Sequence, residues 1–121
     1  MPYKLEANLE KGFVHLVYSG DVTLEERQQA KDAVFALCFE KNLHRSLVDL
    51  RGSNIQMSEA DIIKFADSFK NTKIPENYRL AGIADPDNQK ENILDILIAT
   101  EGINIKYFLD FDSAVSWLTA V

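Results

Sequence analysis

Several acidic residues and one arginine stand where the sequence predicts that strands end. Asp49 and Arg51 close one apolar run, and Asp85 and Asp110 each follow another. Carboxyl ends of parallel strands meet at one edge of a sheet, so these side chains should share a rim. The full predicted rim comprises Ser19, Asp21, Asp49, Arg51, Asp85 and Asp110. Carboxylates gathered in this way could bind Mg²⁺, as in phosphoryl-transfer sites.

A simpler role accounts for the same aspartates. Asp85 precedes Pro86, which is favoured in the first turn of a helix, and Asp110 precedes another helical segment. Asp49 and Arg51, two residues apart on a strand, point to one face and can pair with each other. We therefore expect helix caps and an ion pair, and we predict no metal, no cofactor and no catalytic residue.

Ser58 stands at the start of a predicted helix, with Asp61 three residues later. This spacing is typical of a capping box, in which the two side chains bind free backbone N–H groups. A phosphate on Ser58 would meet the positive end of the helix, although Glu59 and Asp61 would repel it. We therefore expect Ser58 to act mainly as a helix cap, and we keep phosphorylation of Ser58 as a secondary hypothesis.

The remaining reactive side chains carry no recognisable motif. His15 and His44 are far apart in the sequence, and neither lies beside a nucleophile motif, so both are expected to be structural. Cys38, the only cysteine, lies within the apolar stretch AVFALCF and is expected to be a small buried hydrophobe. Dinucleotide-binding, P-loop, zinc-protease and serine-hydrolase motifs are absent from the sequence.

Hydrophobic periodicity predicts the elements that hold these residues. Strands are expected at 3–9, 13–20, 46–50, 78–84 and 103–109. Helices are expected to begin at the caps Thr23, Ser58, Asp85 and Asp110 or Asp112, and the first to end near Asn42. The order β-β-α-β-α-β-α-β-α predicts one α/β domain over 1–121, with a five-stranded, mainly parallel sheet, an antiparallel N-terminal hairpin strand and four helices.

The charge and the distribution of apolar residues limit the kinds of partner expected for this protein. The formal net charge of -6 opposes binding to nucleic acid. The N-terminal residues lack a signal peptide, and no apolar run is long enough to insert into a membrane, so we expect a cytoplasmic protein.

Four stretches distributed along the chain form a familiar pattern: YSGDVTLEE, LVDLRG, YRLAGIAD and the closing FLDFDSAVSWL. Together they resemble the SpoIIAA-like proteins of the STAS-like fold. The resemblance implies a small partner-binding domain, with a serine phosphorylated at the helix after the third strand. The family's namesakes, the anti-sigma factor antagonists, carry a D-S-S-G type stretch at this serine. Here MSEA stands in its place, so Ser58 is present without the flanking signature. The fold also resembles lipid-binding CRAL-TRIO (Sec14-like) domains.

The third predicted helix is more apolar than a surface helix needs to be. Its apolar residues include Ile93, Ile96, Leu97 and Ile98, which extend beyond one stripe. A neighbouring helix, a second subunit or an apolar ligand would cover the excess. The first hypothesis is a non-enzymatic module that binds a protein partner or forms a homodimer. The alternatives are a carrier or sensor of a small apolar, lipid-like ligand and, third, an enzyme using the acidic rim.

Overall fold

The computed structural model of the chain describes residues 2–85, 97 and 102–120. The strands in this part are β1 (Tyr3–Asn8), β2 (Phe13–Tyr18), β3 (Gly20–Thr23), β4 (Arg45–Asp49), β5 (Ser53–Gln56), β6 (Arg79–Ile83) and β7 (Asn104–Phe108). The helices are α1 (Leu24–Lys41), α2 (Glu59–Ser68) with the following 3-10 turn η1 (Phe69–Asn71), and α4 (Phe111–Leu118). Within the described residues, no helix is both long and apolar enough to span a membrane.

The main sheet has five strands in the order β1-β2-β4-β6-β7. β1 runs antiparallel to β2, and every other neighbouring pair in this sheet is parallel. The prediction of an α/β fold with a mixed sheet is confirmed. Strand β6 carries small residues, as the sequence suggested, and the ring of Tyr107 on β7 fills the space above Gly82.

The predicted element order is wrong in two places. β3 and β5 form a separate parallel pair, reached directly from β2 and β4. Gly20 and Gly52 both have positive φ at these corners, and Gly20 N–H donates to Gly52 O at 3.3 Å. The strands GDVT and SNIQ are short and mostly polar, so periodicity alone did not reveal them.

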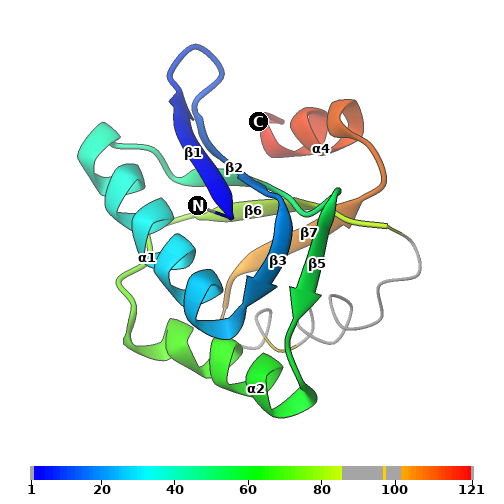
Figure 1. Cartoon of the computed structure of the whole chain (residues 1–121). Helices are drawn as coiled ribbons and strands as arrows, with labels where there is room; N and C mark the ends of the chain where they lie inside the picture. The colour runs from blue at the N-terminus through cyan, green and yellow to red at the C-terminus, as the bar shows by residue number, and fades with distance from the viewer. Residues whose placement is uncertain (1, 86–96, 98–101, 121) are drawn as a thin grey trace.

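The helices cover the two faces of the main sheet unequally (Figure 1). α1 and α2 pack together over one face, where the larger core includes Leu16, Val34 and Phe65. α4 covers the other face over β4, β6 and β7, with Ala114 and Leu118 fully buried. The sheet therefore separates two apolar clusters that can be probed independently.

The predicted helix starts are confirmed at three positions. Thr23 and Ser58 each form a complete capping box, and Asp110 accepts from Ser113 N–H at 2.8 Å. α1 ends at Asn42, whose φ of 55° is left-handed, as predicted. The third predicted helix, with Ile93, Ile96 and Ile98, lies outside the described residues apart from Leu97, which is helical and packs against the larger core.

Candidate functional site

Asp49 and Arg51 form the centre of the predicted rim. Arg51 donates to Asp49 from Nε at 3.0 Å, from Nη2 at 2.9 Å and from its backbone N–H at 3.0 Å. The carboxylate is largely buried, whereas the Arg51 side chain is 44% exposed. The bidentate geometry confines both groups, so the predicted pairing of the two residues is present.

Burial, hydrogen bonds and nearby charges shift the pKa values of Asp49 and Arg51. Burial, the largest influence, raises the pKa of Asp49, but hydrogen bonds from Arg51 and the nearby charges of Arg51 and His15 together hold it below its usual value. The pKa of Arg51 is raised, chiefly by its hydrogen bond to Asp49 and further by the charges of Asp110 and Asp85. The pair therefore stays ionised throughout the neutral range.

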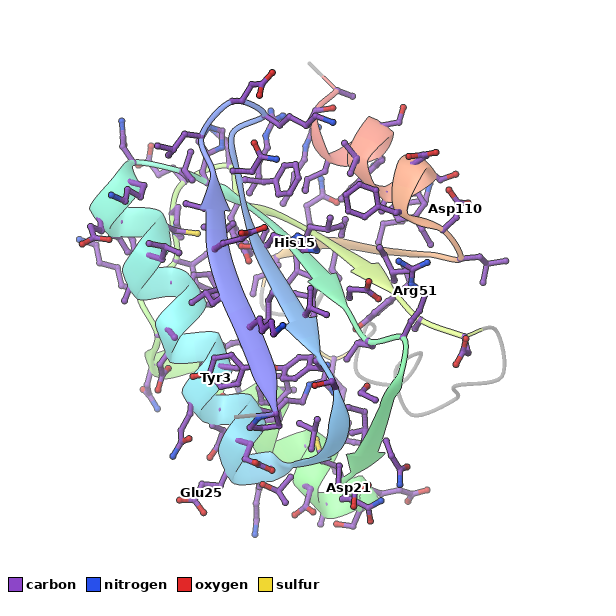
Figure 2. The ribbon with its side chains drawn as sticks, turned by 45° about the horizontal axis from the view of Figure 1, so that its top comes forward. Tyr3, His15, Asp21, Glu25, Arg51 and Asp110 are labelled. Carbon is purple, nitrogen blue, oxygen red and sulfur yellow. The ribbon has the colours of Figure 1, made fainter. Side chains whose placement is uncertain are left out.

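Asp110 and Asp85 flank the pair at the carboxyl ends of β7 and β6. Asp110 caps α4, and hydrogen bonds from Ser113 lower the pKa of its carboxyl group. Figure 2 shows Arg51 and Asp110 at one end of the sheet, whereas Asp21, the second residue of β3, is labelled away from them. Asp21 belongs to the separate β3–β5 pair, where it accepts from Asn54 at 3.1 Å, so its place in a binding rim stays a prediction.

No three His, Cys, Asp or Glu side chains in the described part of the chain are grouped as a metal site would require. Cys38 is buried, as expected, and burial raises the pKa of its thiol. His15 lies against Phe111, with ring centroids 5.8 Å apart, and its Nδ1 is 3.9 Å from a Glu6 oxygen. Its Nε2 is buried without a hydrogen-bond partner among the described residues, and His15 is part of the packing beneath α4.

Ser58 is exposed at the start of α2. Its Oγ accepts from Asp61 N–H at 3.1 Å, while Asp61 accepts from Ser58 N–H at 3.1 Å. The hydroxyl group is thus already used by the fold, in agreement with the prediction of a cap.

A second candidate site lies in the larger core, between the main sheet, α1 and α2. It is a cavity of about 40 Å³. Most of its lining is aliphatic or aromatic and comes from both the sheet and the helices: Leu16, Val34, Phe35, Val48, Phe65, Phe69, Leu80 and Ile105. Two charged residues of α1, Arg27 and Lys31, also line it, and they are only 4% and 7% exposed.

Neither buried cation was predicted from the sequence. Arg27 lies over the rings of Tyr18 and Phe65, at 5.7 and 4.9 Å from their centroids. Lys31 Nζ donates to Ser68 and Thr72 at the end of α2. A signal was present, because residues 27 and 31 share the helical stripe of the buried residues 34 and 38, where a charge is unexpected.

Comparison with known proteins identifies a solved structure with a similar fold. No family model matches the chain, and no curated protein matches it. A crystal structure of an uncharacterized protein from Shewanella loihica PV-4, described as a DUF3478 family member with a SpoIIAA-like fold, is similar to it. The similarity has a TM-score of 0.57 at 18% identity and covers 96% of this chain and 91% of that one. The chain therefore has a SpoIIAA-like fold, as the sequence resemblance implied.

Proposed function

We propose that this STAS-like module is a non-enzymatic carrier or sensor of a small amphipathic acid, taken up between the main sheet and the helices α1 and α2. The observation that carries the proposal is the pair of buried cations, Arg27 and Lys31, in the wall of an otherwise apolar cavity. Burying a charge destabilises the folded state, so a cavity needed only for packing would leave the protein more stable if its walls were entirely apolar. An acid with an apolar tail would match both parts of the lining.

Lys31 is the better defined of the two cations. Its ammonium group is 2.8 Å from Ser68 Oγ, 3.0 Å from Thr72 Oγ1 and 3.3 Å from Ser68 O, all of which are neutral. Lys31 Nζ also forms an ion pair with Asp32 Oδ1 at 3.5 Å, but the Asp32 side chain is 69% exposed and lies at the surface. A ligand carboxylate would thus bring to Lys31 a full negative charge inside the core, where attraction is screened least.

The size of the cavity defines how binding must proceed. A volume of about 40 Å³ has room for roughly three or four water molecules, whereas ligand sites usually measure roughly 300–1,000 Å³. A tail of ten or twelve carbons therefore requires the wall to move outward. Affinity would then include the cost of opening, and binding would be slower than diffusion.

Native mass spectrometry of the full chain, prepared without detergent and mixed with decanoate, tests the proposal. The expected result is one bound decanoate, lost in Lys31→Met and retained in Lys64→Met. Methionine keeps the apolar stem of Lys31 and removes its charge. Ser68 Oγ still donates to Phe65 O, and Thr72 Oγ1 to Ser68 O, so the fold should tolerate the change. Equal decanoate binding by both variants would contradict the proposal.

Protein binding is the second candidate function. The outer face of α2 carries Ile63, which is 52% exposed, in the helix that Ser58 caps. An exposed large apolar side chain on a helix is suited to a partner surface, although scattered examples are common on proteins without partners. Ile63→Lys would abolish capture of a protein partner and leave decanoate binding unchanged, which separates the two functions.

The third hypothesis, an enzyme using the acidic rim, has the least support. Asp49 is held by Arg51, and Asp110 by the first turn of α4. Neither carboxylate is poised with a raised pKa, as a general acid would be. We therefore propose that the rim is structural.

A further inference from the structure

A separate hollow lies at the opposite end of the parallel strands from the rim. It measures about 610 Å³, which falls within the usual range for ligand sites. The first residues of three parallel strands line it: Arg45 of β4, Arg79 of β6 and Asn104 of β7. His44 and Asn77 add further polar groups.

The charge of this hollow is opposite to that of the whole chain. Arg45 and Arg79 give its lining two positive charges, whereas the chain has a formal net charge of -6. Among the described residues, no aspartate or glutamate lines the hollow, and neither arginine has a salt-bridge partner. A compact cationic site in an acidic protein attracts anions selectively.

The two arginines are held in place by α4. Arg45 Nη1 donates to Leu118 O at 2.7 Å, and Arg79 Nη1 donates to Trp117 O at 3.2 Å and Ala120 O at 2.7 Å. These bonds satisfy the negative end of the helix. They engage only one nitrogen of each guanidinium group, and Arg45 Nε is buried without a hydrogen-bond partner. Each side chain is thus anchored through Nη1, and neither Nη2 donates a hydrogen bond to a described residue.

We propose that this hollow binds the phosphate group of a small phosphorylated molecule. Arg45 and Arg79 are direct partners in the parallel register, so their side chains leave neighbouring strands side by side. Two guanidinium forks present more donors than the two oxygens of a carboxylate can accept, whereas a phosphate offers a third oxygen and a second charge. Asn77 and Asn104 would contact the rest of the molecule. This site is distinct from the proposed acid-binding cavity, with which it shares only Tyr78 among its lining residues.

An NMR titration tests the site. Inorganic phosphate is added to the full chain at constant ionic strength, and the ¹H–¹⁵N signals of the backbone amides are followed. The expected result is saturable shifts of the amides of Asn77, Gly102 and Asn104. Arg79→Gln should weaken the affinity for phosphate by about tenfold or more, since a hydrogen bond to a charged group is lost. Arg79→Lys keeps the charge but loses the fork and should weaken it less. Lys64→Gln, which removes an equal charge from the exposed face of α2, should leave it unchanged.

A second probe identifies the source of the phosphate. Vesicles containing phosphatidic acid would shift the same amides if the group belongs to a lipid, and inorganic phosphate would shift them if it belongs to a free compound; either result supports the site. The proposal is overturned if neither probe shifts these amides. It is also overturned if folded Arg45→Gln and Arg79→Gln proteins, verified by their melting transitions, bind phosphate as the parent does.

Discussion

Replacing Asp49 with asparagine tests how far the rim pair stabilises the fold. The substitution keeps the shape of the side chain but places an amide NH2 group against an Arg51 nitrogen, where a carboxylate oxygen had accepted at 2.9 Å. The carboxylate accepts three hydrogen bonds in all, two of them from the guanidinium group. Because Arg51 is 44% exposed, it can recover water contacts. We therefore expect a loss of about 1–2 kcal/mol, between the values typical of surface and buried pairs.

Such a loss corresponds to a decrease in melting temperature of roughly 3–10 °C for a domain of this size. The pH dependence gives a second measure. The folded pKa of Asp49 is lowered, so its contribution is present above the ordinary carboxyl pKa and is lost as the pH falls through the lower folded value. Thermal unfolding of the parent, Asp49→Asn, Arg51→Ala and the double variant, at pH 7 and in acid, measures both effects. Additive losses, or an unchanged acid profile in Asp49→Asn, would refute a stabilising pair.

Three further substitutions have defined outcomes in thermal unfolding. Ser58→Ala should lose about 0.5–2 kcal/mol and Ser58→Asp much less, because Asp also caps helices; a phosphorylation switch further requires that Asp, unlike Ala, abolish partner binding. Tyr78→Phe should be neutral or stabilising by up to about 1 kcal/mol, because the Tyr78 hydroxyl group is buried without a well-formed hydrogen bond to a described residue; a large loss would mean that the hydroxyl group bonds to Ser46. Gly82→Ala should cost about 1–3 kcal/mol because its methyl group would collide with the ring of Tyr107, and an unaffected melting temperature would mean that the ring moves freely.

Local signals predicted those parts of the fold that depend on neighbours in the sequence. Capping residues fixed the starts of α1, α2 and α4, and Asn42 marked the end of α1. The pair β3 and β5 depends on residues far apart in the chain, such as Val22 and Ile55, so no local pattern indicated it.

The candidate sites also differ in whether they depend on residues that are neighbours in the sequence. The proximity of Asp49 and Arg51 follows from their spacing on one strand. The hollow at Arg45 and Arg79 requires the register of two strands and the position of the end of α4, neither of which one sequence reveals. The buried cations of α1 were accessible to pattern analysis, because Arg27 and Lys31 interrupt the apolar stripe of Val34 and Cys38.

The central claim is that an amphipathic acid enters the cavity beneath α1 and α2. The most direct measurement is methyl NMR of the full chain titrated with decanoate. We expect saturation at one equivalent, with shifts in Val34, Val48 and Ile105, which line the cavity. Methyl groups of Val115 and Leu118, in the cluster on the other face of the sheet, should stay in place. If the shifts are confined to the α4 face, or if neither face shows any, decanoate does not bind in the cavity beneath α1 and α2.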